Sequence, residues 1–232
     1  MQAIIASTST VHGSSYLEYL LPVLKTHFED VDEVLFIPFA RPGGISHQEY
    51  TLKASEGLKT CVETVKGVHQ FEDMQKAILE AKAIFVGGGN TFLLVKQLHE
   101  LNLMNPLKTS ILNGARYLGT SAGSNICGLT MQTTNDMPIV YPPSFNTLGL
   151  LNFNINPHYL DPDTNSTHKG ETRETRIKEF LTYNSTIVVG LREGSWIKID
   201  NNDVTLEGDL PAVIFKSQKQ PYQLAPSSHL KF

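Results

Sequence analysis

Short apolar runs alternate with helix-like segments through the first half of this 232-residue chain. The apolar runs have the length of buried strands and stand at residues 3–6, 34–37 and 83–86. Between them, apolar residues recur at three- and four-residue intervals over 16–28 and 71–81, as on one face of a helix. This order of elements is typical of βαβ units, in which successive strands lie parallel in one sheet. We therefore expect an α/β fold with a mostly parallel central sheet flanked by helices.

The second half of the chain has a different pattern. Extended segments precede a helix predicted over 172–181, and a buried strand is expected at 186–189. The tail has alternating strand pairs that include runs at 196–199 and 212–215, and Asn201-Asn202-Asp203 is a plausible hairpin turn. The C-terminal part is therefore expected to add extra β-strands to the α/β core.

Composition excludes several classes of protein. Apolar residues make up 41% of the chain, enough to bury a continuous core, and no repeat or linker divides it, so we expect one domain over 1–232. The formal charge is −4 and no Lys/Arg block interleaves with aromatic residues, which argues against a nucleic-acid partner. No apolar run approaches the roughly 18 residues of a membrane span.

The cysteines and the N-terminal residues bear on the cellular compartment. Cys61 and Cys127 lie far apart and form no C-x-x-C pair, which indicates neither a zinc site nor a disulfide framework. The first residues lack a basic leader followed by a long apolar segment. We therefore expect a cytoplasmic protein without a metal site and without a membrane contact.

Two glycine-rich turns come directly after predicted strands. Gly87-Gly88-Gly89-Asn90-Thr91 follows the strand at 83–86, and Gly119-Thr120-Ser121-Ala122-Gly123 follows a shorter strand at Tyr117-Leu118. Open α/β sheets bind their ligands at the carboxyl ends of the strands. Both turns are therefore expected at the functional edge of the sheet.

The second of these turns matches the pattern G-x-S-x-G. In that pattern a serine occupies a sharp strand-to-helix turn, and the flanking glycines let backbone segments approach closely. Ser121 would then be an exposed nucleophile, with the amide of Ala122 directed at the oxyanion. The alternative is an ordinary turn of small residues. Serine at this position makes the chain a candidate serine hydrolase.

The first glycine turn could supply a second oxyanion donor. A phosphate-binding loop is the competing use, but the pattern G-x-x-x-x-G-K-[ST] is absent, and no ribose-binding acid follows at the spacing of a dinucleotide site. A tight turn without a ligand remains the other alternative.

A serine nucleophile needs a base, and the chain has eight histidines. His27, His69 and His99 lie in or beside helical patterns, where structural roles are common. His158 instead ends the uncharged segment 151–157, in which Pro157 favours an extended approach of the chain to the histidine. His158 is therefore the preferred candidate.

Two acids could orient such a base. Asp136 is an isolated carboxylate in an otherwise uncharged stretch, and Glu193 follows the predicted strand at 186–189. Asp136 could instead form an Asx turn before Pro138 or bind the free amino group of a peptide. Glu193 could lie in an ordinary surface turn. The sequence favours Glu193 only modestly.

The charged run 168–176 has the composition of a solvated helix start. Its alternative interpretation is functional, because the guanidinium of Arg173 can bind a carboxylate through two hydrogen bonds at once.

Five short motifs occur together: Gly-Gly-Gly-Asn at 87–90, Gly-Thr-Ser-Ala-Gly at 119–123, Asn-Asp-Met-Pro at 135–138, Asn-Pro-His at 156–158 and Lys-Gly-Glu-Thr-Arg-Glu at 169–174. In order and spacing they resemble peptidase E, the α-aspartyl dipeptidase family. The likeness runs from the first strand through Glu-Gly-Ser-Trp at 193–196 to Phe232. The segments 41–44 and 161–167 do not match the family pattern. The resemblance therefore does not specify the part of the substrate preference that such loops control.

The resemblance implies a class I glutamine-amidotransferase-like fold and metal-independent, cofactor-free release of an N-terminal aspartate from Asp-X dipeptides. Ser121 corresponds to the nucleophile and His158 to the general base. Either Glu193 or Asp136 would be the acid that orients the histidine. Gly89 and Ala122 would supply the oxyanion amides. Asn90 and Arg173 would contact the substrate, with Arg173 at the aspartyl carboxylate.

The expected partner is therefore a small Asp-X peptide, and a homodimer is the assembly that we consider. Two rival functions are a cyanophycinase-like hydrolase of aspartyl-linked peptides and a non-catalytic module that binds acidic peptides. A glutaminase is disfavoured because Ser121 stands where that class has cysteine.

Overall fold

A seven-stranded sheet with the order β3-β2-β4-β5-β1-β8-β9 forms the centre of the computed structural model, which describes residues 1–163, 165, 167 and 170–232. Its strands are β1 (Gln2–Ala6), β2 (Glu33–Ile37), β3 (Thr64–Gly67), β4 (Ala83–Val86), β5 (Arg116–Thr120), β8 (Ser195–Asp200) and β9 (Asp203–Gly208). The first five pair in parallel, and β8 and β9 are added antiparallel beside β1. The predicted mostly parallel sheet is confirmed.

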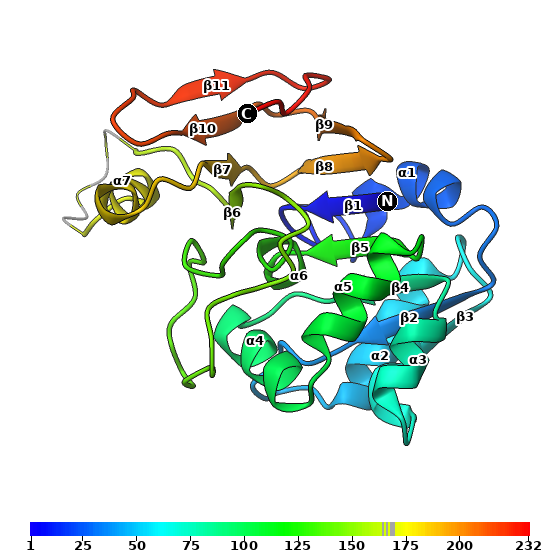
Figure 1. The fold of residues 1–232 in the computed structure, drawn as a ribbon. Helices are drawn as coiled ribbons and strands as arrows, with labels where there is room; N and C mark the ends of the chain where they lie inside the picture. Colours follow the sequence, from blue (N-terminus) through cyan, green and yellow to red (C-terminus); the bar gives the residue numbers. More distant parts are fainter. Residues whose placement is uncertain (164, 166, 168–169) are drawn as a thin grey trace.

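Helices cover both faces of this sheet (Figure 1). They are α1 (Leu21–His27), α2 (His47–Leu58), α3 (Met74–Glu80), α4 (Thr91–Glu100) and α5 (Met104–Leu112). Alternate side chains of a strand point to opposite faces. Ala3 and Ile5 accordingly join a core with α3, α4 and α5, whereas Ile4 and Ala6 join a second core with α1 and α2.

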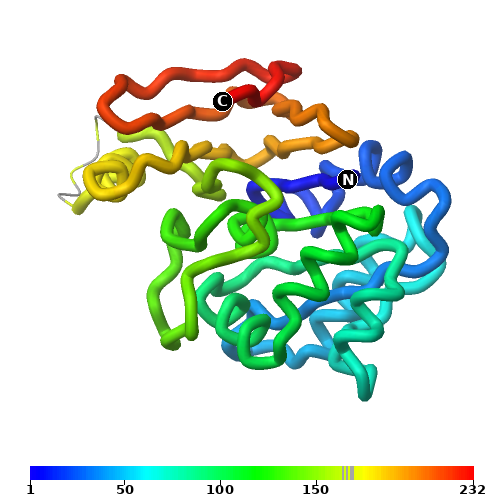
Figure 2. Tube along the Cα trace, viewed as in Figure 1, coloured from blue at the N-terminus to red at the C-terminus, as the bar shows by residue number. Residues whose placement is uncertain are grey.

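A second, four-stranded sheet has the order β11-β10-β7-β6. Figure 2 shows the orange and red C-terminal segment above the dark blue N-terminal strand. The strands of the second sheet are β6 (Asn154–Pro157), β7 (Val188–Leu191), β10 (Ala212–Phe215) and β11 (Tyr222–Leu224). The helix α7 (Arg173–Tyr183) packs on it through Ile177 and Leu181. The expected extra C-terminal strands are confirmed.

Several elements differ from the sequence prediction. The helix predicted over 16–28 begins later, with a 3₁₀ turn at Glu18–Leu20 and then α1, because Leu17 has the left-handed φ of 61°. Strand β7 starts two residues after its predicted beginning. The helices α2 and α5 and the strand β3 were not predicted. The buried faces of the two helices include the polar residues Thr51 and Ser110, and β3 buries only Gly67. Within the described residues, no helix is both long and apolar enough to cross a bilayer.

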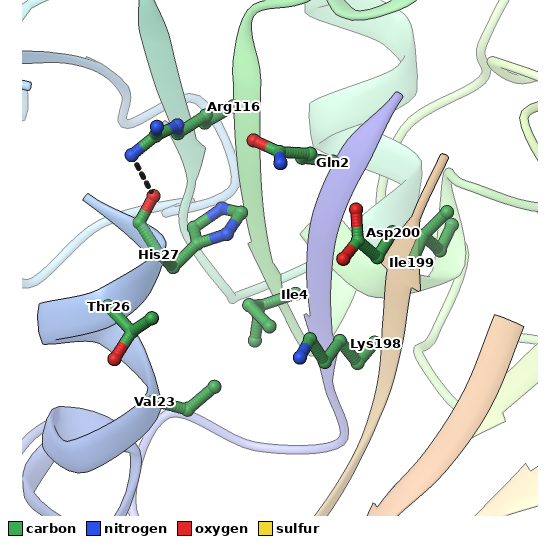
Figure 3. A pocket seen from close by; sticks show the side chains of 9 residues that line it. All are labelled: Gln2, Ile4, Val23, Thr26, His27, Arg116, Lys198, Ile199 and Asp200. Carbon is green, nitrogen blue, oxygen red and sulfur yellow. Dashed lines mark hydrogen bonds between the residues drawn. The ribbon is translucent and has the colours of Figure 1, made fainter. Parts of the chain in front are cut away.

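A cavity of about 240 Å³ lies where β1 and β5 begin, at the edge opposite the carboxyl ends of the parallel strands (Figure 3). Arg116 donates a hydrogen bond of 2.7 Å to the carbonyl of His27 there, and His27 Nε2 lies 3.1 Å from the carbonyl oxygen of Tyr117. Burial, assisted by the charges of Arg116 and Lys198, lowers the pKa of His27 to about 4.

This shift predicts a loss of stability in mild acid. Between pH 6.5 and pH 4, His27 is neutral in the folded protein, whereas an unfolded histidine, with a pKa of about 6.5, is protonated. Protonation therefore favours the unfolded chain as pH falls from 6.5 towards 4, and its contribution between pH 7 and pH 5 is about 2 kcal/mol. Urea unfolding at both pH values should show that the free energy of unfolding falls less from pH 7 to pH 5 in His27→Gln than in the wild type. Identical losses would contradict the assignment.

Candidate active site

Ser121 stands at the end of β5, in the turn into the single-turn helix α6 (Ala122–Asn125). Its backbone has φ 55° and ψ −108°, a conformation that L-residues adopt rarely. Two donors hold the turn: Ser121 N–H donates to the Ala6 carbonyl at 3.1 Å, and the single hydroxyl proton of Ser124 lies between the carbonyl oxygens of Ala6 and Gly119, which are 2.6 and 2.8 Å from Oγ. The strain at Ser121 is therefore maintained by its surroundings.

The glycines on either side of Ser121 are required by close backbone contacts. A Cβ at Gly119 would lie 2.6 Å from the carbonyl oxygen of Gly123, and one at Gly123 would lie 2.2 Å from that of Val86. Neither gap can hold a side chain, so the G-x-S-x-G spacing lets α6 start directly against β4. Tyr117 fixes this arrangement by donating a hydrogen bond of 2.6 Å to the Gly123 carbonyl.

His158 follows β6 and Glu193 follows β7, and these two strands are parallel neighbours with Pro157 opposite Leu191. Both side chains therefore leave the same edge of the second sheet. His158 adopts φ 54°. Its backbone N–H donates a hydrogen bond of 2.8 Å to Ser7 Oγ, and the Ser7 hydroxyl donates one of 2.7 Å to the Leu191 carbonyl. Ser7, the residue after β1, thus ties the histidine backbone to both sheets.

The three side chains form a continuous hydrogen-bonded chain. His158 Nε2 lies 2.8 Å from Ser121 Oγ, and His158 Nδ1 lies 2.6 Å from Glu193 Oε1. Because a carboxylate can only accept, Nδ1 carries the proton of the second bond, and the lone pair on Nε2 accepts from the serine hydroxyl. The arrangement can remove the proton from Ser121 and stabilise the resulting imidazolium.

Two backbone amides beside Ser121 have no internal acceptor. Within the described residues, neither Gly89 N–H nor Ala122 N–H donates a hydrogen bond to the protein. Ala122 opens α6, where helix N–H groups lack partners. The glycine turn of Gly89 approaches closely, since a Cβ at Gly88 would lie 3.0 Å from Ser121 Cβ.

Asp136 lies at the start of α4. Its Oδ2 accepts hydrogen bonds from Thr91 N–H at 2.7 Å, Thr91 Oγ1 at 2.6 Å and Thr134 Oγ1 at 3.0 Å. A carboxylate at a helix N-terminus satisfies unpaired amides and complements the helix dipole. The structure thus brings Glu193, and not Asp136, into hydrogen-bonding contact with His158.

Asn90 caps the same helix. Its side-chain oxygen accepts from Leu93 N–H at 3.1 Å, and its amide group donates to the carbonyl of Met137 at 2.9 Å. The oxygen therefore caps α4, and the amide group connects the glycine turn to the segment after Asp136. The predicted substrate contact of Asn90 stays a prediction.

Arg173 is the first residue of α7. Burial and the charge of Arg176 lower the pKa of its guanidinium, while the charges of Asp136 and Glu193 raise it. The charges of the two acids therefore reach this cation, and no hydrogen bond or ion pair of its side chain is found within the described residues. His168 and Lys169, which belong to the same charged run, lie outside the described residues.

Sequence reasoning did not single out Ser7, although it positions His158. The available signal was a polar residue directly after the first buried strand, at the edge where the glycine turns also lie. Such a residue is too common in α/β proteins to be distinguished without the three-dimensional contacts.

Comparison with known proteins gives consistent relatives along the whole chain. The chain is 43% identical to the protein named "Probable alpha-aspartyl dipeptidase" of Drosophila melanogaster, over 99% of its own length and 95% of the relative. It is 44% identical to peptidase E of Streptomyces coelicolor, over 99% and 93%. A crystal structure of a peptidase from an acI-B1 actinobacterium superposes with a TM-score of 0.74 at 17% identity, covering 100% of this chain and 96% of that one.

The last structure supports the fold alone, because its sequence identity is low. The model of peptidase family S51 matches residues 3–207, which include Ser121, His158 and Glu193. The resemblance to peptidase E is thereby confirmed, and this chain belongs to peptidase family S51.

Proposed function

We propose that this protein is a serine dipeptidase that hydrolyses the bond after an N-terminal aspartate in small Asp-X peptides. The observation that carries the proposal is the hydrogen-bonded chain from Ser121 through His158 to Glu193, in a member of a peptidase family whose relatives include one named for α-aspartyl dipeptidase activity.

In the acylation step, His158 Nε2 takes the proton of Ser121 as Oγ attacks the peptide carbonyl. The carbonyl oxygen becomes an oxyanion, which Gly89 N–H and Ala122 N–H stabilise. His158 then returns the proton to the leaving amine as the C–N bond breaks. Water attacks the acyl-enzyme with His158 again as base, and the free aspartate leaves as Ser121 recovers its proton.

The substrate's charges fit the polar groups around this centre. Arg173 supplies the cation for the aspartyl side chain, because its guanidinium has no carboxylate partner within the described residues and can form a bidentate pair. Asp136 lies close enough for its charge to act on Arg173, and it could balance the substrate's amino group.

Three broader features remain part of the proposal. We expect one catalytic domain over 1–232, a cytoplasmic location for a chain whose two cysteines are both free, and a homodimer as the assembly to test first. Sedimentation velocity of the purified protein checks the last of these.

Ser121→Ala should abolish release of aspartate from Asp-Leu. The fold should be retained, because the methyl group fits where the serine Cβ lies. Aspartate release and thermal melting should be measured for both proteins, and wild-type activity should be unchanged by EDTA. Substantial hydrolysis by Ser121→Ala, or an EDTA loss that zinc restores, would overturn the mechanism.

Glu193→Gln should mainly lower kcat, since a neutral amide no longer selects the productive histidine tautomer or stabilises the imidazolium. Loss of the orienting acid in a serine triad costs up to about ten-thousandfold. The matched variant Asp136→Asn should keep most of kcat and lose about 0.3–1 kcal/mol of stability, because its charge no longer complements the dipole at the start of α4. Steady-state constants with Asp-Leu compare the two. A large loss of kcat in Asp136→Asn with Glu193→Gln nearly normal would reverse the roles.

Arg173→Ala should slow cleavage of Asp-Leu about tenfold to a hundredfold, the range expected for a lost hydrogen bond to a charged group. Cleavage of Asn-Leu should change much less, so selectivity should collapse. Arg176→Ala, one turn later on the same helix with a more exposed side chain, is the control. Equal slowing of both substrates would make Arg173 a structural residue. Glu-Leu and β-aspartyl peptides in the same panel test the cyanophycinase-like alternative.

A further inference from the structure

Tyr50 lies behind the glycine turn and contacts it through one hydrogen bond. The residue belongs to α2, is 1% exposed, and donates from its hydroxyl to the Gly88 carbonyl at 2.9 Å. Its ring is held edge-on by Phe36, with centroids 4.9 Å apart, and the Arg41 guanidinium lies 4.9 Å from its centroid on one face. The hydroxyl is therefore presented to the turn from a fixed position.

The glycine turn separates Tyr50 from Ser121. A Cβ at Gly87 would lie 2.6 Å from the Tyr50 hydroxyl, whereas a Cβ at Gly88 would lie 3.0 Å from Ser121 Cβ. In extended chain, successive Cβ positions point to opposite sides. Tyr50 and the nucleophile thus face opposite sides of the same short segment.

The peptide between Gly88 and Gly89 transmits this arrangement. In a trans peptide, the N–H and the C=O point in opposite directions. A Gly88 carbonyl directed at Tyr50 therefore directs the Gly89 N–H towards the side of Ser121, where that amide has no acceptor within the described residues.

The same peptide has little intrinsic preference for one orientation. Rotating it changes ψ of Gly88 and φ of Gly89, and both residues are glycines, for which such rotation carries little steric cost. Gly89 already has φ 145°, outside the range that other residues readily adopt. A contact from outside the turn must therefore select the orientation.

We infer that Tyr50 is a positioning residue that sets the oxyanion hole, by holding the Gly88 carbonyl so that the Gly89 N–H faces the reacting carbonyl. The inference rests on the proposed function, in which Gly89 is an oxyanion donor. Tyr50 touches no substrate atom. Its effect should therefore appear in the transition state and leave ground-state binding unchanged.

Tyr50→Phe tests this directly, because it removes the hydroxyl and keeps the ring. Removing an oxyanion donor outright costs about a hundredfold to a thousandfold in kcat. Loss of its orientation should cost about tenfold to a hundredfold, with KM for Asp-Leu changed less than twofold and an unchanged fold by circular dichroism. Tyr222→Phe is the control, since it also loses a phenol hydroxyl but lies in β11, outside the glycine turn, and should keep its kcat within twofold.

A second measurement is independent of peptide specificity. A fluorophosphonate reacts with an activated serine as the Ser121 O–P bond forms, fluoride leaves and His158 takes the proton; the phosphoryl oxygen occupies the oxyanion hole. Tyr50→Phe should slow this labelling by a similar factor. Undiminished kcat and labelling, or a parallel change in kcat, KM and melting temperature, would overturn the inference. Wild-type protein that is labelled but releases no aspartate would refute the proposed substrate alone.

Discussion

The close approach of α6 to β4 is the constraint on which the rest of the site depends. Gly123 lies against the Val86 carbonyl and Gly119 against Gly123, so any side chain at either glycine would push the serine turn away from the sheet. The left-handed φ of Ser121 follows from this tight path, and hydrogen bonds to the Ala6 and Gly119 carbonyls keep it in place. Ser121, the proposed nucleophile, is therefore positioned by backbone contacts with central strands, which are among the most rigid parts of a domain.

The second sheet contributes the other two members of the chain of hydrogen bonds. His158 and Glu193 are adjacent only because β6 and β7 pair in parallel, with Pro157 opposite Leu191. A one-residue slip in that register would reverse the side of the sheet to which each side chain points. Ser7 then fixes the distance between the two sheets by bonding to the backbone of both His158 and Leu191. The geometry of the proposed triad is thus a consequence of strand register more than of the side chains' own conformations.

Local patterns predicted part of this arrangement and could not predict the rest. The elbow at Ser121 and the extended approach to His158 were recognisable because glycine spacing and Pro157 act on their immediate neighbours. The partner of His158 could only be narrowed to two acids, with Glu193 modestly favoured, since Glu193 is 35 residues away and meets the histidine only through strand pairing. Tyr50 was missed for the same reason, since it lies in a helix with a weak pattern and reaches Gly88 across 38 residues. Asp136 was selected because it is an isolated charge in the sequence. In the structure its carboxylate accepts hydrogen bonds from Thr91 at the start of α4.

The solvent exposure of the His158–Glu193 pair affects how it works. The two side chains are 31% and 46% exposed, and an ion pair in contact with water contributes little to the stability of a fold. The pair does not need to stabilise the fold, because the His158 backbone is already fixed by Ser7. In the proposed reaction a bound dipeptide would exclude water from the site, and electrostatic interactions strengthen as the local dielectric falls. We therefore propose that Glu193 acts most strongly on the imidazolium when substrate covers it, so that its contribution is concentrated in the step in which Ser121 loses its proton.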